Sequence, residues 1–579
     1  MKFMRLGNRP DTFYTEEATR TLISDLPSDL TVRVNTVTYL LHKLQFPLLQ
    51  KCGLLQQLCS EKEDTTSVTM EFDDFPGGAD AFELCAKFCY GIKIDLSAHN
   101  FMPAICAARF MRMTESFAKG NFISKLDVFF NSCILEGWKD SVVTLQTTER
   151  FFEWSDNIGI IRRCIDSVVA KILTQPSKVR WSYTYTRPGY EQKKHHKSAP
   201  KDWWTEDVAD LNIDLFRCII NTVKSTNMLP PQLIGEALHV YARRWLPDVT
   251  KNNMPHPETS TASQTTQERS VDQKSQLEMI VSLIPEDKGS VSVGFLLRLL
   301  STAKLLKASE VLIAQLINKC SVQLEEATIN DLLLPSHDSS DHHMYDIELV
   351  QIVVEGFIDQ CRKSYSRDES SLDVIRKVAK LVDAFLQVVS SDVNMPVQKV
   401  VSLANVLPEF ARPEHDKLYK AISIYLNEHP QMSKEEKKHL CSILDCQKLS
   451  AAARAHAVKN ERLPTRTIVQ LLFFEHQKHD RNTITRRDSQ QPVAEDFKNR
   501  LQLYSDKGPT EQDSDRRRSC PSNTSQRIDP ESEVKSKGKK VIEARSEKVK
   551  EIIEEESKHD VTNVKIHRSK SEHGRRKGK

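Results

Sequence analysis

Serines near the C-terminus follow arginines at a spacing that arginine-directed protein kinases recognise. Residues 486–489 read R-R-D-S, residues 516–519 read R-R-R-S, and residues 568–571 read R-S-K-S, with an arginine three positions before the last serine. Such kinases pair the arginines with carboxylates, and phosphorylation adds about −1.5 to −2 charges to a serine. The spacing predicts phosphorylation of Ser489, Ser519 and Ser571.

These serines lie in a basic tail that differs from the rest of the chain. From Asp480 onward there are 25 Lys and Arg against 19 Asp and Glu, whereas the other residues carry 57 against 60. Each Lys or Arg near an anionic lipid surface contributes about 1 kcal/mol. We therefore expect phosphorylation either to release the tail from an anionic membrane or to create a site for a phosphoserine-binding protein. The nearly neutral remainder argues against a nucleic-acid partner.

Motifs for catalysis or metal binding are not recognisable in the sequence. The pairs Cys85–Cys89 and Cys441–Cys446 lack a second pair at ligand spacing, so buried helical thiols explain both. Phosphate-binding glycine loops and the G-x-S-x-G nucleophile motif are absent from the sequence. We therefore predict a protein without catalytic residues, cofactor or metal, and not an enzyme.

The N-terminal part has the pattern of a small mixed fold. Residues 30–34 (LTVRV) and 37–41 (VTYLL) alternate in polarity as half-buried strands do, and Asn35-Thr36 suits the turn between them. From residue 48 the apolar spacing changes to that of a helix. The further predicted elements are a strand at 68–72, a helix at 79–90, a short strand at 92–96, and helices at 99–117 and 122–135.

This order of elements, with Asp29 before the first strand and LLHK at 40–43, resembles a BTB/POZ domain over residues 28–135. The resemblance implies dimerisation and docking of the cullin-3 scaffold of RING ubiquitin ligases. It matches Asp29 and His42-Lys43 to the family's start-of-fold and first-helix positions. It also implies that the cullin packs on the loop at 90–92 and on the helices after it. An alternative is that Asp29 and His42 only organise the local turn. The implied candidates are Asp29, His42, Lys43, Tyr90, Gly91 and Ile92.

One short insertion departs from the plant relatives of this pattern. Those relatives run LLHK directly into FPLL, whereas Leu44-Gln45 intervene here. Two extra helical residues rotate the rest of the helix by about 200°, at roughly 100° per residue. We therefore expect either a looped-out insertion or a displaced first helix, and the second would disturb cullin binding.

Length and composition predict several parts. The chain has 579 residues, more than the about 250–300 at which a single core stops growing. No apolar run reaches the roughly 18–20 residues of a membrane span, and 13 cysteines in apolar contexts are typical of reduced thiols. Besides the BTB-like domain, the predicted parts are a lead-in at 1–27, a helical extension at 136–175, a linker at 176–200, an all-helical domain at 201–480 with a disordered insert at 250–275, and a disordered basic tail at 481–579, in which 533–558 can form a short helix.

The predicted linker has two interpretations. Tyr183, Tyr185 and Tyr190 lie among basic residues, a composition compatible with stacking on nucleic acid. Its prolines, glycine and charged residues are equally typical of a solvated connection between domains. We favour the solvated linker.

Long blocks of the helical part resemble the plant NON-PHOTOTROPIC HYPOCOTYL 3 family. With MKFMRLGNRPDTF at the N-terminus, the resemblance covers roughly residues 1–480. Members of this family pair an N-terminal BTB domain with a helical domain. The blocks are KDWW (201–204), PPQLIGEALHVYARRWLP (230–247), HDKLYKAISIYLNEHP (415–430), CSILDCQKLSAAARAHAVKNERLP (441–464) and VQLLFFEHQ (469–477).

The resemblance implies a signalling adaptor in blue-light phototropism and auxin-linked organ development. A family-typical tyrosine matches Tyr419, which we interpret as a half-buried aromatic side chain on an amphipathic helix. The implied partners are a cullin-3 scaffold, a second BTB chain in a homodimer or heterodimer, and a photoreceptor kinase or an auxin-transport-linked client. The implied location is the cytoplasm, with peripheral association at the plasma membrane.

Three functional hypotheses are compatible with these patterns. The first is a substrate adaptor of a cullin-3 ubiquitin ligase, in which the BTB domain binds the cullin and the helical domain binds the client. The second is a plasma-membrane-associated signalling scaffold that recruits no ligase. The third is a nuclear transcriptional regulator, for which the sequence offers basic segments but no DNA-binding module.

Overall fold

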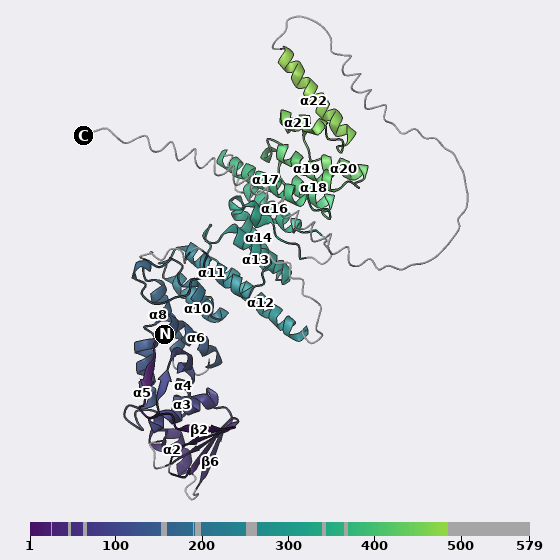
Figure 1. The fold of residues 1–579 in the computed structure, drawn as a ribbon. Helices are drawn as coiled ribbons and strands as arrows, with labels where there is room; N and C mark the ends of the chain where they lie inside the picture. The colour runs from purple at the N-terminus through teal and green to yellow at the C-terminus, as the bar shows by residue number, and fades with distance from the viewer. Residues whose placement is uncertain are drawn as a thin grey trace, which may run out of the picture. The chain divides into compact units, whose positions relative to one another are not determined.

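The computed structural model describes residues 1–24, 26–43, 48–61, 67–151, 159–188, 190, 198–249, 263–337, 343–363 and 369–484. A small α/β region at the N-terminus is followed by many helices, which confirms the predicted fold class (Figure 1). The described chain divides into two compact units. The first comprises residues 1–381 and 405–411, and the second comprises residues 382–404 and the residues from 412 onward.

A five-stranded sheet in the order β2-β3-β5-β4-β6 forms the centre of the N-terminal region. The predicted hairpin is present, with β4 antiparallel to β5 and Asn35 at a φ of 52° in the turn. The third predicted strand, β6, lies parallel to β4. The strands are β2 (Phe13–Glu16), β3 (Thr19–Leu22), β4 (Leu30–Val34), β5 (Val37–Leu41) and β6 (Val68–Phe72).

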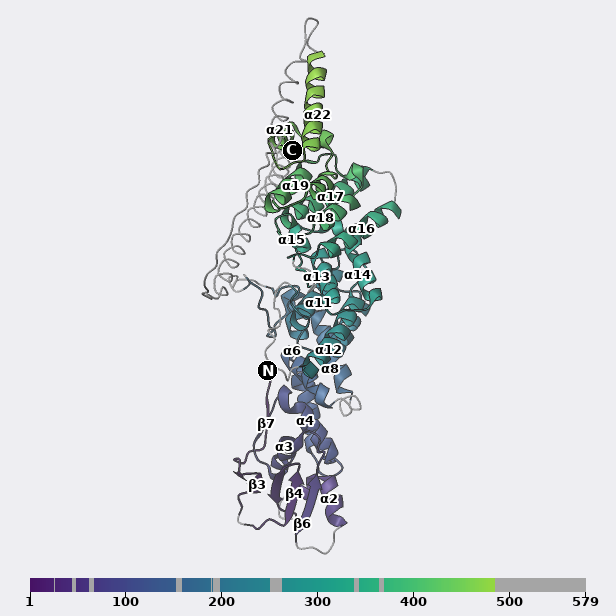
Figure 2. The ribbon, with the colours of Figure 1, turned by 90° about the vertical axis from the view of Figure 1, so that its right-hand side faces the viewer.

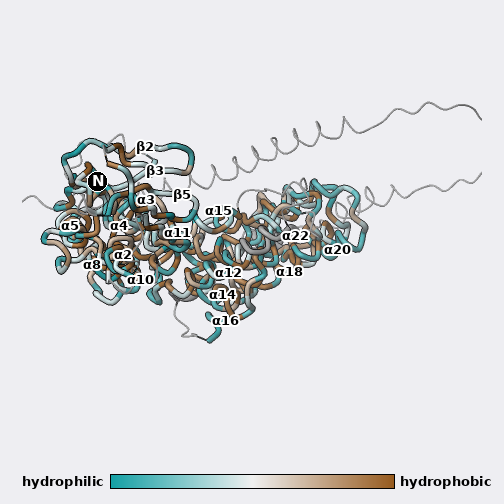
Figure 3. Tube along the Cα trace, turned by 90° about the horizontal axis from the view of Figure 1, so that it is seen from below, coloured by the Kyte–Doolittle hydropathy of each residue, from teal (hydrophilic) through white to brown (hydrophobic). Residues whose placement is uncertain are grey.

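The N-terminal residues are part of the fold and not a separate lead-in. Strand β3 pairs parallel with β5, and β1 (Met4–Leu6) pairs antiparallel with β7 (Ile94–Leu96) in a second, two-stranded sheet. The prediction for residues 1–27 missed these strands because they are short and polar. Figure 3 shows the hydrophilic colouring of the chain around β2 and β3.

Helices pack on the sheet and close the core of the N-terminal region (Figure 2). Alternate residues of β4 point inward, and Val32 and Val34 are fully buried. The Leu44-Gln45 insertion lies outside the described residues, so its effect on the first helix stays a prediction. The helices are α1 (Leu48–Lys51), α2 (Gly53–Ser60), α3 (Gly78–Tyr90), α4 (Ala98–Phe110) and α5 (Phe122–Phe129), which a π-helical turn continues (Phe130–Ile134).

The rest of the first unit is helical. Pro231 occupies the first turn of α11. A backbone N–H at that position would have no partner within the helix, so proline costs no hydrogen bond there. The elements in chain order are α6 (Trp138–Thr148), α8 (Ile160–Ile172), α9 (Thr205–Val208), α10 (Ile213–Ser225), α11 (Pro231–Trp245), α12 (Ser263–Leu283), α13 (Val293–Leu305), α14 (Glu310–Val322), α15 (Ile329–Leu332) and α16 (Ile347–Lys363).

Helix α12 corrects the predicted insert at 250–275. The helix begins at Ser263, so the second half of that stretch is helical, and residues 250–262 lie outside the described residues. The sequence from Ser263 to Lys274 is polar and lacks an apolar stripe, which is why its composition predicts a loop. The C-terminal turns of the helix bury Leu277 and Ile280 and thereby attach it to the unit.

Helix α17 (Glu369–Val389) runs from the first unit into the second. In the second unit, the buried Arg412 guanidinium pairs with Asp383 at 2.8 Å and donates to the carbonyl of Ala404 at 2.6 Å. The remaining helices are α18 (Val397–Val406), α19 (Asp416–Glu428), α20 (Lys434–Cys441), α21 (Ala451–Val458) and α22 (Thr465–Ile484).

The described part of the predicted linker is packed against protein. The rings of Trp181 and Tyr183 lie 5.6 and 5.5 Å from the ring of Trp203, between centroids. The hydroxyl groups of Tyr183 and Tyr190 are 2.7 Å apart. The aromatic residues of this stretch are therefore engaged within the chain, and the interpretation as a solvated linker is wrong for them.

A buried carboxylate joins helix α6, which follows the BTB-like region, to the helical region. Asp207 is 4% exposed and lies within α9, one residue before the helix ends. Its Oδ2 accepts a hydrogen bond from the indole Nε1 of Trp138 at 2.6 Å and one from the backbone N–H of Thr184 at 3.1 Å. The Nζ of Lys139 lies 3.5 Å from Oδ1 and donates to the hydroxyl of Thr184 at 2.5 Å. One side chain thus holds helix α6, segment 179–188 and helix α9 together.

We predict that Asp207→Ala strongly destabilises the first unit. The change leaves the buried indole N–H of Trp138 and the partly buried N–H of Thr184 without this acceptor, and a buried donor that lacks an acceptor costs about 1–3 kcal/mol. The expected loss is therefore about 3 kcal/mol. Tryptophan fluorescence during urea unfolding measures this loss of stability. Trp138, which bonds to Asp207, and Trp203 both report on the region, with ring centroids 4.5 Å apart.

Asp214→Ala is the matched control. Asp214 pairs with Arg217 on the surface of α10 and its side chain is 72% exposed, so we expect a change within about 0.5 kcal/mol. Equal shifts of the unfolding midpoint in the two variants would contradict the role given to Asp207.

Candidate interaction sites

Asp29 is tied to the ends of three strands. Its Oδ1 accepts a hydrogen bond from the backbone N–H of Lys43 at 2.7 Å. Its own N–H donates to the carbonyl of Leu41 at 3.1 Å, and its carbonyl accepts from Val68 at 3.2 Å. These bonds fix the hairpin and β6 at one end of the sheet. The geometry therefore gives Asp29 a structural role at the start of the fold.

His42 and Tyr90 form a second buried contact beside Asp29. The backbone N–H of His42 donates to the Tyr90 hydroxyl oxygen at 3.0 Å. The Nε2 of His42 lies 3.1 Å from the carbonyl oxygen of Leu26 and 3.2 Å from the hydroxyl of Ser24. Both His42 and Tyr90 are 3% exposed, and burial raises the pKa of the Tyr90 hydroxyl, which stays neutral. These two predicted site residues therefore meet in the core.

Gly91 and Ile92 connect α3 to the N-terminal segment. Gly91 ends α3 with a φ of 70°, a conformation that glycine adopts without strain. Its carbonyl accepts hydrogen bonds from the N–H groups of Asn8 at 3.1 Å and Arg9 at 3.0 Å. Ile92 is buried. Of the six predicted candidates, the structure joins Asp29 to Lys43 and His42 to Tyr90 by hydrogen bonds, while Gly91 and Ile92 follow Tyr90 at the end of α3.

Lys51 also contacts the end of α3, although no motif in the sequence indicates this. Its Nζ lies 3.3 and 3.5 Å from the carbonyl oxygens of Cys89 and Phe88, at the C-terminal end of α3. A cation is favourable there because the last carbonyl groups of a helix carry partial negative charge. The ammonium group also lies 4.8 Å from the centre of the Phe88 ring.

Tyr419 lies on α19 with its ring in the core of the second unit. The residue is buried, and its hydroxyl oxygen lies 2.7 Å from the Nδ1 of His456 on α21. Burial raises the pKa of this hydroxyl. Tyr419 is thus more deeply buried than predicted: it is a core residue on an amphipathic helix, and it also links α19 to α21. The phosphorylation candidates Ser489, Ser519 and Ser571, like the helix predicted at 533–558, lie outside the described residues.

The cysteines among the described residues are thiols, and they are not arranged to bind a metal ion. No group of three or more His, Cys, Asp or Glu in that part of the chain is placed to hold a metal ion. The sulfur atoms of Cys52 and Cys89 lie 3.6 Å apart. The contact with Cys89, together with burial, raises the pKa of the Cys52 thiol, and burial raises that of Cys85. Raised values keep these thiols protonated and unreactive.

Where the chain is described, it offers no helix whose length and apolar character would suffice to cross a membrane.

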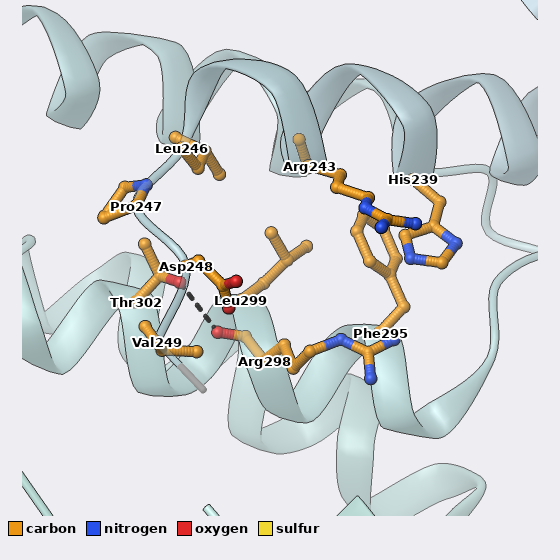
Figure 4. A pocket seen from close by; sticks show the side chains of 11 residues that line it. His239, Arg243, Leu246, Pro247, Asp248, Val249, Phe295, Arg298, Leu299 and Thr302 are labelled. Atoms are coloured by element: carbon orange, nitrogen blue, oxygen red, sulfur yellow. Dashed lines mark hydrogen bonds between the residues drawn. The ribbon is translucent and has the colours of Figure 1, made fainter. Parts of the chain in front are cut away.

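A cavity of about 530 Å³ lies between α11 and α13 (Figure 4). His239 and Arg243 project into it from α11, and Phe295 and Arg298 from α13. The sequence does not indicate this cavity, because residues from two helices that are far apart in the chain form it. The available signal was the spacing of four between His239 and Arg243, which places both on one face of α11.

The chain is similar to one protein-family model and to several plant proteins. Residues 202–454 match the model of the NPH3 family. A BTB/POZ domain-containing protein of Arabidopsis thaliana is 56% identical over 497 residues, which are 85% of this chain and 88% of the relative. The phototropic-responsive NPH3 family protein NPY1 of the same plant is 39% identical, over 82% of this chain and 81% of its own length. Its root phototropism protein 3 is 34% identical, over 82% and 77%. No solved structure matches the chain.

We predict that Tyr90→Phe destabilises the N-terminal region by about 1–3 kcal/mol, since the buried N–H of His42 loses its acceptor. Tyr14→Phe is the control, because Tyr14 on β2 is 54% exposed. Protection of the His42 amide against hydrogen exchange should fall in Tyr90→Phe and stay unchanged in Tyr14→Phe. Unchanged protection in both variants would show that the Tyr90 hydroxyl contributes nothing to this contact.

Proposed function

The chain belongs to the NPH3 family of BTB/POZ domain-containing proteins, and from that membership we propose that it is a substrate adaptor of a cullin-3 RING ubiquitin ligase. In this proposal the BTB domain dimerises and binds the cullin, and the helical domain binds the client. The chain itself performs no chemistry. Its contribution is proximity, which raises the effective concentration of the client near the ubiquitin-loaded enzyme.

The observation that carries the proposal is the packed connection between the two parts. An adaptor gains most when its two binding regions are held by folded structure, since a long flexible linker lowers the effective concentration. Asp207 bonds to Trp138 of α6 and to Thr184 of the connecting segment. Arg187 of the same segment pairs with Asp202 and with Glu236 of α11, both at 2.7 Å. The connection is therefore fastened at several points along its length.

Two of the residues that the resemblance suggests for the cullin surface are buried. The family places the cullin near the loop at residues 90–92 and the helices that follow it, but Tyr90 and Ile92 are buried. The exposed apolar residues nearby in sequence are Phe117, before α5, and Val128, on α5, which is 54% exposed. We propose that Val128 contributes to the cullin interface.

The client side of the proposal is the helical domain. By the family's signalling role, the client is a photoreceptor kinase or a protein linked to auxin transport, and the site of action is the cytoplasm beneath the plasma membrane. The names of the relatives NPY1 and root phototropism protein 3 refer to phototropism in those proteins.

The alternative function is a membrane-associated scaffold without ligase recruitment. It is favoured by the basic tail, in which 25 Lys and Arg face 19 Asp and Glu from Asp480 onward. Under this alternative, phosphorylation at Ser489 and Ser519 would control membrane partition, and the cullin would not bind.

We predict that the full-length protein binds the purified N-terminal domain of cullin-3 and that Val128→Glu weakens this binding at least about tenfold. A carboxylate without a partner in a buried interface costs more than the 1.4 kcal/mol that corresponds to tenfold. Isothermal titration calorimetry gives the two dissociation constants.

Ile23→Glu is the control, since Ile23 is 68% exposed and follows β3, away in sequence from α5. We expect it to bind the cullin as the unchanged protein does. Absence of binding at micromolar concentration by the unchanged protein would reject the adaptor proposal in favour of the scaffold. Equal binding by Val128→Glu would reject the assigned surface.

A further inference from the structure

The cavity between α11 and α13 combines an apolar wall with positive charge. Its volume of about 530 Å³ falls within the roughly 300–1,000 Å³ typical of ligand pockets. Phe295 and Leu299 of α13 and Leu246 at the end of α11 are buried and supply the apolar wall. Arg243 is exposed, and Arg298 is half-buried. A ligand that enters between the helices therefore meets guanidinium groups and an apolar surface together (Figure 4).

The two arginines of the cavity differ from the arginines around it. Arg244, next to Arg243 on α11, pairs with Asp210, and Arg187 pairs with Asp202 and Glu236. Across the described residues, neither Arg243 nor Arg298 has a carboxylate within ion-pair distance. The fold thus neutralises the arginines outside the cavity and leaves the two inside it available.

The other charged groups at the cavity leave an excess of positive charge. Among the described residues that line the cavity, Asp248 is one acid against two arginines. His239 stands beside Phe295, with ring centroids 5.1 Å apart. Burial lowers the pKa of His239, Glu236 opposes this effect, and Arg298 and Arg243 add to it. The ring is therefore neutral near pH 7, and the positive charge belongs to the arginines.

The observations favour an anionic side chain as the occupant. An arginine without a carboxylate partner binds carboxylate and phosphate groups through charge-assisted hydrogen bonds. A membrane surface presents charge to an exposed face rather than to a recess between two helices, and a nucleic acid requires a groove that follows its backbone. The exposed position of Arg243 lets a side chain reach in while its backbone stays outside.

We propose that this cavity binds a client peptide through an acidic side chain, either a phosphoserine or a carboxylate, held by Arg243 and Arg298, with a neighbouring apolar side chain against Phe295 and Leu299. The inference rests on the proposed function, because it assigns the client-binding role of the helical domain to a defined site. The requirement for an apolar neighbour distinguishes such a peptide from a free anion.

The test is binding of the purified full-length protein to three matched sets of fluorescent hexapeptides. The sets share flanking positions drawn from Leu, Phe, Val and Ala and differ only in a central phosphoserine, glutamate or serine. We expect saturable binding of the phosphoserine set, the glutamate set or both, and at least about tenfold weaker binding of the serine set. The preference between the first two identifies the source of the charge.

Arg243→Gln and Arg298→Gln should each weaken the binding of the anionic peptides about tenfold to a hundredfold. Arg298→Lys, which keeps the charge, should recover part of it. Arg244→Gln is the control, since it removes the same charge from the adjacent residue, outside the cavity, and should change binding less than about twofold. Unchanged thermal unfolding of the two glutamine variants separates loss of the site from loss of the fold.

Several outcomes would overturn the proposal. They are equal binding of the serine set, binding that survives both glutamine substitutions, absence of saturable binding by every set, and displacement of the peptides by inorganic phosphate at equal concentration, which would indicate a small-anion site. Displacement by phosphatidylserine vesicles or by polyuridylate through the same arginines would assign the cavity to a membrane or to RNA instead.

The cullin measurement separates this inference from the function on which it rests. Arg298→Gln should bind the N-terminal domain of cullin-3 as the unchanged protein does. If the peptides bind through the arginines but cullin-3 does not bind, the site stands and the adaptor function falls. If cullin-3 binds and the peptides fail, the adaptor function stands and its client site lies elsewhere.

Discussion

The buried carboxylate of Asp207 is the constraint on which the arrangement of the first unit depends. It accepts from an indole of α6 and from a backbone amide of segment 179–188, while it belongs to α9. A carboxylate in this position is stable only because its partners are all present, since an unpaired buried charge costs several kcal/mol. The contact of helix α6, segment 179–188 and helix α9 around Asp207, which we call the joint, therefore requires all three elements together.

In the BTB-like region, residues predicted to bind a partner stabilise the fold instead. Asp29, His42 and Tyr90 are candidates because of their positions in a family pattern, and the structure uses them to fasten strand ends to α3. Their hydrogen-bonding groups face inward, where a missing partner is costly. Exposed apolar residues, such as Val128 on α5, are therefore the positions of this region that are open to a partner.

The sequence predicted elements whose pattern is local and missed those that depend on distant contacts. The hairpin at 30–41 and the strand at 68–72 have the period of half-buried strands, and the structure has them at those residues. Strand β3 has no such period and exists because β5 offers it an edge. The packing of Trp181 and Tyr183 on Trp203, and the cavity between α11 and α13, likewise bring together residues that no local pattern relates.

Helix α11 connects the joint to the cavity. Glu236 pairs with Arg187 of the connecting segment, and the indole of Trp245 donates to the carbonyl of Ala209 after α9 at 2.8 Å. His239 and Arg243 follow Glu236 by three and seven residues, so they lie on the same face of the helix and line the cavity. The bonds that fix α11 to the connecting segment therefore also fix where Arg243 is placed at the cavity.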